Sequence, residues 1–286
     1  MAEGEGLLTV TSADGHRADL LLRLPPAPRA ALLWLPALGV SARHYLPFAE
    51  ALAARGVAVF LHEWRGHGSS TWRAGRDCDW GYRTLLTDIA ASRAALETAL
   101  PADAATQPRV LGGHSLGGQL AGCHLALQPG AAQALWLVAS GAPYWRVFPR
   151  PRRWLLPLAY RFLPWLADRV GHLPGRRIGF AGNEARGVIH DWARSGLSGR
   201  YAAAGLEADL EAGMARWRGR ACGLVLADDW LGPPSSLAYL LGKLVQAECH
   251  AGVLSARQLG TRADHYAWMR QPQAVVEALL ADGLPG

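Results

Sequence analysis

The chain has 286 residues, of which 50% are hydrophobic and 18% are charged. This length and composition can bury a large core, which excludes a disordered protein and suits one α/β domain with an insertion. The formal net charge is +6, but the basic residues are scattered or lie in one mid-chain segment without a recognised nucleic-acid motif. We therefore expect no nucleic-acid partner.

Cysteine spacing and hydropathy indicate the compartment. The four cysteines lie far apart and form no C-x-x-C pair, which favours free thiols in a reducing compartment. The first six residues lack the basic and apolar regions of a secretory signal. The longest apolar stretch, Trp154 to Ala167, is interrupted by Pro157, Arg161 and Pro164 and falls short of the roughly 18 apolar residues of a membrane span. We expect a cytoplasmic protein without stable membrane insertion.

Strands and helices are predicted to alternate up to residue 141. Two strands, Leu7 to Val10 and Ala18 to Leu24, flank the turn signal Ala-Asp-Gly and predict a hairpin. Continuous apolar runs predict buried strands, and apolar residues at helical spacing predict the helices between them. Strands are expected at 30–35, 57–61, 109–111 and 134–139, and helices at 45–54, 82–100 and 119–127. This alternation predicts an α/β fold with a mostly parallel sheet covered on both faces.

The pattern changes after Gly141. Residues 142–220 contain no clear strand, many of the tryptophans, several prolines and the basic run Arg150 to Arg153, and we expect an inserted, mainly helical lid there. Alternation resumes with a buried strand at 221–227, a helix at 235–244, a weaker strand at 252–256 and a closing helix at 272–280. The predicted core thus comprises residues 1–141 and 221–286.

The sequence Gly-His-Ser-Leu-Gly at 113–117 follows the strand at 109–111 and precedes the helix at 119–127. A G-x-S-x-G sequence between a strand and a helix is typical of a nucleophile elbow, a sharp turn that exposes the serine hydroxyl. Its two glycines lack a Cβ and tolerate the crowded turn. We predict Ser115 as the nucleophile.

An oxyanion hole needs two backbone N–H groups. One is expected from Leu116, the residue after the serine, at the start of the following helix. The second is expected from the loop after the strand that ends at Leu35, with Leu38 as first choice and Ala37 next.

A serine hydroxyl needs a neighbouring base, and the base needs an orienting carboxylate. In elbow hydrolases the acid and then the histidine follow the serine along the chain. His265 lies in a loop just before the closing helix, whereas His250 lies in or beside a predicted strand, so His265 is the expected base. Asp228 and Asp229 both follow the strand at 221–227, where catalytic groups of α/β sheets gather, and both are candidates for the acid.

Two further patterns predict no additional site. His62-Glu63 with His67 lacks the H-E-x-x-H spacing of a helical metal site. The glycines between 112 and 118 are not followed by the Lys-Ser/Thr pair of a phosphate-binding loop. We expect neither a metal nor a cofactor.

Three segments make the chain similar to the α/β-hydrolase superfamily over nearly its full length: Leu-Pro-Ala-Leu-Gly-Val at 35–40, Glu-Trp-Arg-Gly-His-Gly-Ser-Ser at 63–70, and Gly-His-Ser-Leu-Gly-Gly at 113–118. It most resembles predicted bacterial α/β hydrolases near the serine aminopeptidase and monoacylglycerol-lipase-like group. The resemblance implies the α/β-hydrolase fold and a Ser-Asp-His triad. In that superfamily the acid often begins a turn that ends in proline four residues later, so the resemblance favours Asp229, with Pro233, over Asp228. The family histidine matches His265.

Two positions depart from the family pattern. Many members have His-Gly where this chain has Pro36-Ala37, and many have Asp where it has Glu63. The first departure bears on the second oxyanion donor, and neither concerns the triad.

Residues and resemblance together predict a serine hydrolase that cleaves a carboxylic ester of an apolar or mixed small acyl substrate. An acyltransferase with the same triad and a non-catalytic binding protein on a hydrolase scaffold are the alternatives. Aromatic residues of the predicted lid either line an acyl pocket or pack the lid onto the core; they are Tyr144, Trp145, Trp154, Trp165 and Trp192. The basic and aromatic run from Arg150 to Arg169 is expected to be a solvated face, with contact to a membrane surface or an anionic substrate as the alternative.

Overall fold

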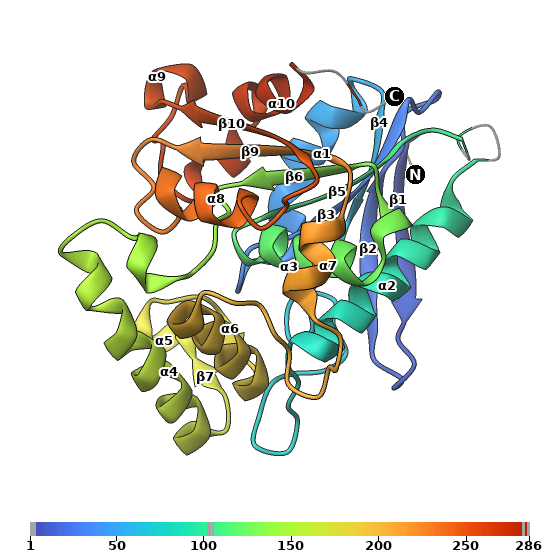
Figure 1. Cartoon of the computed structure of the whole chain (residues 1–286). Coiled ribbons are helices and arrows are strands. Elements are labelled where there is room, and N and C mark those ends of the chain that lie inside the picture. The colour runs from blue at the N-terminus through green and yellow to red at the C-terminus, as the bar shows by residue number, and fades with distance from the viewer. Residues whose placement is uncertain (1–3, 102–103, 105, 282–283, 285–286) are drawn as a thin grey trace.

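The computed structural model describes residues 4–101, 104, 106–281 and 284 (Figure 1). Met1, Ala2 and Glu3, on which the expectation of no secretory signal partly rests, lie outside them. An eight-stranded sheet has the order β1-β2-β4-β3-β5-β6-β9-β10. Its strands are β1 (Glu5–Thr11), β2 (Arg17–Arg23), β3 (Ala30–Leu35), β4 (Val57–Leu61), β5 (Arg109–His114), β6 (Ala134–Val138), β9 (Arg220–Leu226) and β10 (Glu248–Leu254).

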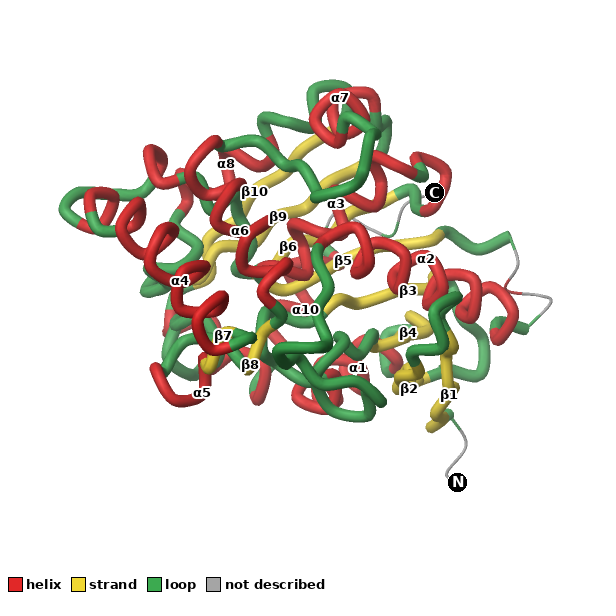
Figure 2. Tube along the Cα trace, turned by 90° about the horizontal axis from the view of Figure 1, so that it is seen from below, coloured by secondary structure: helices red, strands yellow, loops and turns green. Residues whose placement is uncertain are grey.

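The sheet is mostly parallel, as the alternating pattern predicts. Only β1 and β2 pair antiparallel with each other, and β2 pairs antiparallel with β4. The remaining neighbours run parallel. Helices cover both faces of this sheet (Figures 1 and 2), as connections between parallel strands require.

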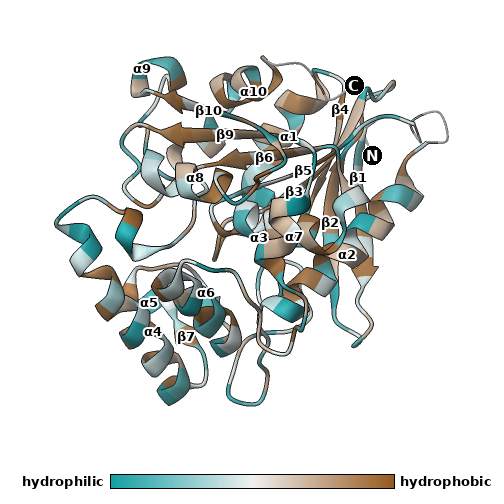
Figure 3. Cartoon of the chain, viewed as in Figure 1, coloured by the Kyte–Doolittle hydropathy of each residue, from teal (hydrophilic) through white to brown (hydrophobic). Residues whose placement is uncertain are grey.

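Each face of the sheet has its own helical layer and its own apolar cluster. One layer contains α1 (Leu46–Ala53), α9 (Ala256–Leu259) and α10 (Gln273–Leu280). The other contains α2 (Tyr82–Ala99), α3 (Leu116–Leu127), α7 (Leu210–Arg216) and α8 (Pro234–Leu241). The apolar strands at the centre of the sheet are visible between the more polar outer surfaces of these helices (Figure 3).

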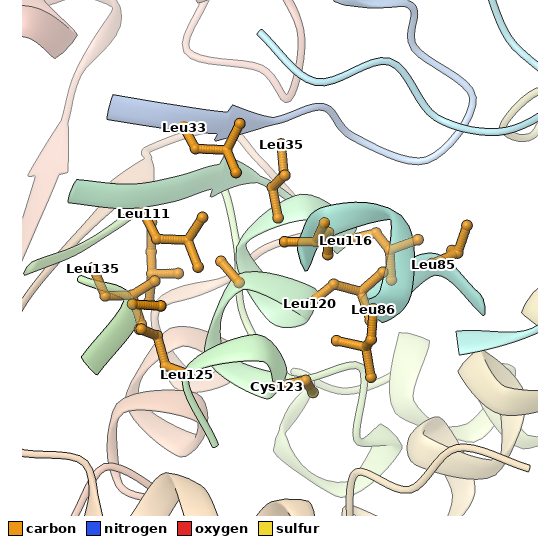
Figure 4. Packing of buried hydrophobic residues seen from close by; sticks show 14 of the residues in the cluster. Leu33, Leu35, Leu85, Leu86, Leu111, Leu116, Leu120, Cys123, Leu125 and Leu135 are labelled. Carbon is orange, nitrogen blue, oxygen red and sulfur yellow. The ribbon is translucent and has the colours of Figure 1, made fainter. Parts of the chain in front are cut away.

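Strand β3 shows why the central strands are apolar throughout. All six of its residues are buried, because the side chains alternate between two covered faces. Leu33 and Leu35 pack in the cluster beneath α2 and α3, whereas Leu32 and Trp34 pack in the opposite cluster. Figure 4 shows the first of these clusters, in which side chains of β3, β5 and α3 interdigitate. This packing fixes the ends of β3 and β5, from which the loops of the candidate site depart.

Strand β10 begins four residues earlier than the sequence predicts. It pairs with β9 along seven residues, from Glu248 opposite Arg220 to Leu254 opposite Leu226. As the edge strand it is exposed for most of its length, so it lacks the continuous apolar run by which a central strand is found.

The 142–220 segment is mainly helical and has two parts. Helices α4 (Leu156–Val170) and α6 (Arg186–Ser198) pack against each other around a small separate cluster. Nearby lie α5 (Gly175–Ile178) and a two-stranded sheet of β7 (Leu173–Pro174) and β8 (Asn183–Glu184). The expectation of no strand in this segment is wrong at these four residues, because so short a pairing leaves no periodicity in the sequence. The later helix α7 packs on α3 in the main core.

No described helix is both long and apolar enough to cross a membrane.

Candidate active site

Ser115 occupies a strained turn between β5 and α3. Its φ of 53° and ψ of −119° lie outside the regions that residues with a Cβ ordinarily adopt. The turn is held from both sides, because the Ser115 N–H donates to the Val138 carbonyl at 3.2 Å and the Ser140 hydroxyl donates to the Ser115 carbonyl at 2.7 Å. Strain of this kind persists where surrounding structure enforces it, and it is common at catalytic residues.

The glycine two residues after the serine allows the elbow to contact the loop that follows β3. A Cβ placed on Gly117 would lie 2.1 Å from the Leu35 carbonyl oxygen and 2.6 Å from that of Pro36. No larger residue fits at that separation. The start of α3 therefore lies directly against residues 35–36, at the base of the loop in which the second oxyanion donor is expected.

Asp229 and His265 are joined by a short hydrogen bond. His265 Nδ1 lies 2.7 Å from Asp229 Oδ2, and both residues are buried. The second carboxylate oxygen, Oδ1, accepts the Leu231 N–H at 2.9 Å, which fixes the orientation of the carboxylate. Because a carboxylate can only accept, the ring proton lies on Nδ1, and Nε2 is free to act as a base.

The alternative candidates for the acid and the base, Asp228 and His250, have different surroundings. Asp228 is exposed, and its backbone N–H donates to the Ala263 carbonyl at 3.0 Å. His250 lies on the edge strand β10, where its Nε2 is 2.9 Å from Glu248 Oε1. Of the four residues considered for acid and base, the structure pairs only Asp229 with His265.

The loop that carries His265 is held beside the elbow. Asp264 Oδ1 accepts the N–H groups of Tyr266 at 3.0 Å and Ala267 at 2.8 Å, so the turn around His265 is closed by its own side chain. The His265 ring lies on the ring of His114, with 4.6 Å between centroids. Since His114 directly precedes Ser115, the His265 ring lies beside the start of the elbow. Ser115 and Asp229 follow the carboxyl ends of β5 and β9, where α/β sheets place their sites.

Tyr45 and His114 support the site, and neither was assigned a role from the sequence. The Ala37 N–H donates to Tyr45 Oη at 2.9 Å, and this oxygen lies 2.8 Å from His114 Nδ1. All three residues are buried. Burial and then the neighbouring His265 hold the pKa of His114 well below its usual value, so its ring is neutral at ordinary pH. His114 stands inside the G-x-S-x-G sequence, but Tyr45 carries no motif that could have revealed it.

The same contacts separate the two candidates for the second oxyanion donor. The Ala37 N–H is already used by Tyr45. The Trp64 indole N–H donates to the Pro36 carbonyl at 2.8 Å and fixes the start of this loop. Within the described part of the chain, the N–H groups of Leu38 and Leu116 donate to no protein group, and so both are available to a ligand.

The 142–220 segment contacts this loop. A Cβ on Gly39, whose φ is +80°, would lie 2.1 Å from the Gly182 backbone nitrogen. The Leu38 side chain packs on the separate cluster of α4 and α6, together with Trp192. The segment therefore lies against the loop that holds the candidate oxyanion donor.

The predicted pocket aromatics differ in their placement. Trp192 packs on Tyr160, with 4.8 Å between ring centroids, and Tyr144 packs on Tyr239 at 5.2 Å. Trp145 is partly buried beside Trp154, at 6.1 Å. Trp154 and Trp165 are each 55% exposed and lie on the outer surface. Of the five, only Trp192 shares a cluster with Leu38.

A buried ion pair ties the 142–220 segment to the loop after β4. His67 Nε2 lies 3.2 Å from Glu184 Oε1, and both side chains are almost fully buried. Burial alone lowers the pKa of His67, but the hydrogen bond and charge of Glu184 raise it above the ordinary value of 6.5. Nearby, burial raises the pKa of Glu63. The His67 side chain thus takes part in a contact between segments, whereas Glu63 Oε1 accepts the Ala42 N–H at 3.1 Å. Among the described residues, no cluster of three or more His, Cys, Asp or Glu is placed to hold a metal.

Comparison with known families identifies the chain. Residues 26–185, more than half of it, match the family described as Serine aminopeptidase, S33. The chain belongs to the serine aminopeptidase family of α/β hydrolases. The match includes Ser115 and the loop at 36–39 but ends before Asp229 and His265, so the pairing of those two residues rests on the geometry given above. A comparison with curated proteins found no significant match.

Solved structures share the fold of this serine aminopeptidase family member along nearly its whole length. A hydrolase from Pseudomonas aeruginosa PA01 is 21% identical, with 98% of each chain covered and a TM-score of 0.59. A thermophilic esterase from Thermogutta terrifontis with malate bound is 16% identical, covering 96% of this chain and 97% of its own, with a TM-score of 0.65. The complex of DcsB with its substrate analogue is 14% identical, with 97% of each chain covered and a TM-score of 0.66. At these identities the likeness concerns the fold.

Proposed function

We propose that this α/β hydrolase is a serine hydrolase that cleaves a carboxylic ester through Ser115, His265 and Asp229. The observation that carries the proposal is the buried 2.7 Å hydrogen bond from His265 Nδ1 to Asp229, in a ring that packs on the residue before Ser115. A serine nucleophile with an oriented imidazole as its base is the arrangement that acyl transfer requires.

In this mechanism Asp229 holds the proton of His265 on Nδ1, and His265 Nε2 removes the Ser115 proton as Oγ attacks the ester carbonyl. The tetrahedral oxyanion is stabilised by the N–H groups of Leu116 and Leu38. His265 then protonates the leaving alcohol, and an acyl-enzyme remains on Ser115. A water molecule, deprotonated by the same histidine, releases the acid.

The neutral state of His114 supports this cycle. When His265 takes up the serine proton, its imidazolium lies against the His114 ring, with 4.6 Å between centroids. A charged His114 would oppose that step by like-charge repulsion, whereas its lowered pKa keeps it uncharged. We assign Tyr45 and His114 as positioning residues that hold the elbow and the oxyanion loop together.

The surroundings of Leu38 support an apolar or mixed acyl substrate. The loop that carries its N–H is covered by the apolar cluster of α4 and α6 with Trp192, so a bound acyl group meets apolar side chains there. The four cysteines are free thiols, which supports the proposed cytoplasmic location.

The proposal is tested by labelling the purified protein with a fluorophosphonate probe and mapping the label by mass spectrometry. We expect a single adduct on Ser115. A panel of esters, thioesters and amides then defines the acyl bond, and product analysis with added alcohols separates hydrolysis from acyl transfer. Absence of labelling under conditions that label a known serine esterase would favour a binding protein on this scaffold.

A further inference from the structure

Helix α4 is apolar on two opposite faces. Its inner face contributes Leu163 and Ala167 to the buried cluster with α6. Its outer face carries large apolar side chains at spacings of three, four and three residues, which place them on one side of a helix. Their exposed fractions are 64% for Leu155, 64% for Leu158, 52% for Phe162 and 55% for Trp165. The outward face of a surface helix is ordinarily polar, and an exposed apolar patch of this kind marks an interaction site.

The outer position of this face is visible in two views. In Figures 1 and 2, α4 lies at the edge of the molecule with α6 on its inner side. Apolar residues continue along α4 among hydrophilic ones in Figure 3. Trp154, 55% exposed, extends the face at its N-terminal end. We call Trp154, Leu155, Leu158, Phe162 and Trp165 the outer face of α4.

The excess positive charge of the protein lies in the segment of sequence that contains this face. Residues 144–180 contain a single acidic residue, Asp168, which is already hydrogen-bonded to His190. The rest of the chain has 21 basic and 22 acidic residues, since the whole has 29 and 23, and so is nearly neutral. Eight arginines provide the local excess: Arg146, Arg150, Arg152, Arg153, Arg161, Arg169, Arg176 and Arg177.

These charges distinguish between possible partners. A second copy of the chain would bring the same arginine-rich face against itself, and the like charges would repel each other across the contact. Anionic lipid head groups complement the arginines, which bind phosphate through paired N–H donors. Tryptophan and phenylalanine beside arginine is also the composition of helices that lie at the boundary between head groups and acyl chains.

We propose that the outer face of α4 docks reversibly on a lipid surface that carries anionic head groups. The apolar side chains enter the boundary region while the surrounding arginines contact the phosphates, with the helix axis lying in the plane of the surface. This contact does not depend on which reaction the site performs. It would place the 142–220 segment, which lies against the oxyanion loop, next to the lipid.

Vesicle flotation of the full-length protein tests the docking. Vesicles of phosphatidylcholine alone are compared with vesicles that contain about one third phosphatidylglycerol, at low and high salt. We expect at least tenfold more bound protein on the anionic vesicles, with most of the difference lost at high salt. The double variant Phe162→Gln/Trp165→Gln should lower binding at least tenfold. Its control is Val253→Gln on the edge strand β10, a side chain that is 54% exposed, which should bind as the parent does.

The charge contribution has its own pair of variants. Arg161→Glu/Arg169→Glu should abolish the preference for anionic vesicles, whereas Arg257→Glu on α9 should preserve it. All variants should keep the melting temperature and the fluorophosphonate labelling of the parent, which separates loss of docking from misfolding and from any failure of the proposed catalytic role.

Three outcomes overturn the proposal. The parent protein fails to bind anionic vesicles, or the outer-face variants bind them as well as the parent. Alternatively, light scattering shows a dimer that Phe162→Gln/Trp165→Gln dissociates while vesicles remain unbound, which would make this face a contact between copies.

Discussion

At Ser115 the backbone conformation is imposed by its neighbours and does not depend on the hydroxyl. The hydrogen bonds that hold the turn use the N–H and carbonyl of this residue and the side chain of Ser140. Ser115→Ala should therefore fold as the parent does while losing ester turnover by on the order of 10³-fold or more. Steady-state kinetics and fluorophosphonate labelling measure the loss, and thermal melting is the control. Turnover near that of the parent would refute the assignment of the nucleophile.

Adjacent or similar residues provide matched controls for the base and the acid. His265→Ala should abolish turnover, whereas His250→Ala should not, because His250 lies on β10 and binds Glu248. Asp229→Asn should lower turnover by a large factor by removing the acceptor for Nδ1–H, and the exposed Asp228 should tolerate the same change. Equal losses within either pair would contradict the pairing of Asp229 with His265.

The role of Tyr45 could not be predicted from the sequence. Ser115 and His265 could be proposed from their places relative to a strand and a helix, whereas the choice of Asp229 over Asp228 needed the resemblance to the α/β hydrolases. Tyr45 could not be proposed in this way, since Ala37 and His114 come together with it only when the fold brings a loop, a short helix and a strand end to one point. Its hydroxyl is the partner of two buried polar groups.

Removal of that hydroxyl has a predictable cost. Tyr45→Phe leaves the Ala37 N–H and His114 Nδ1 without a partner, and we expect a loss of about 1–3 kcal/mol in the free energy of unfolding together with reduced turnover. Tyr239→Phe is the control, because its hydroxyl donates to Gly199 at 3.2 Å from a partly exposed position and should cost less. Urea unfolding and ester kinetics on both variants provide the comparison.

At the scale of elements, the predictable strands are those buried on both faces. Continuous apolar runs revealed β3, β4 and β6 within one residue, whereas β5 continues three residues beyond its prediction through Gly112, Gly113 and His114. The edge strand β10 was misplaced because solvent on one side allows polar residues. The pairing of β7 with β8 depends on contacts between distant residues, among them the ion pair of Glu184 with His67, and such contacts leave no local pattern.

That ion pair predicts a pH dependence of stability. The pKa of His67 is raised in the folded protein, so its contribution is fully present below the unfolded pKa near 6.5 and is lost as the pH rises through the folded value. The stability difference between the parent and His67→Gln should therefore be larger near pH 6 than near pH 9. His190→Gln, in an exposed pair with Asp168, should cost little at either pH. Urea unfolding at both pH values measures this, and an equal difference for His67→Gln at the two values would count against a charged His67.

At the scale of the whole molecule, the cluster of α4 and α6 is separate from the clusters of the sheet core. It is joined to one of these through Leu38 and Trp192, which pack in both clusters. The sequence indicated a change of pattern after Gly141, and it placed the residues of α7 in the inserted segment, whereas α7 covers α3. Helix α7 buries Leu210 and Met214 in the main core. The amino-acid composition of the segment does not indicate this packing.

Trp192→Gln tests whether this junction sets the choice of acyl chain. Trp192 is partly buried and packs with Leu38 beside the proposed oxyanion hole, so a polar side chain there should disfavour long acyl chains over short ones. We expect the ratio of kcat/KM for a long ester to that for a short one to fall at least about fourfold, which is the worth of one buried methylene. The melting temperature should fall by only a few degrees, because the main core is retained. Trp165→Gln, on the outer face of α4, should leave the ratio unchanged for soluble esters. If both variants shift the ratio equally, or if Trp192→Gln unfolds the protein, the junction does not select the acyl chain.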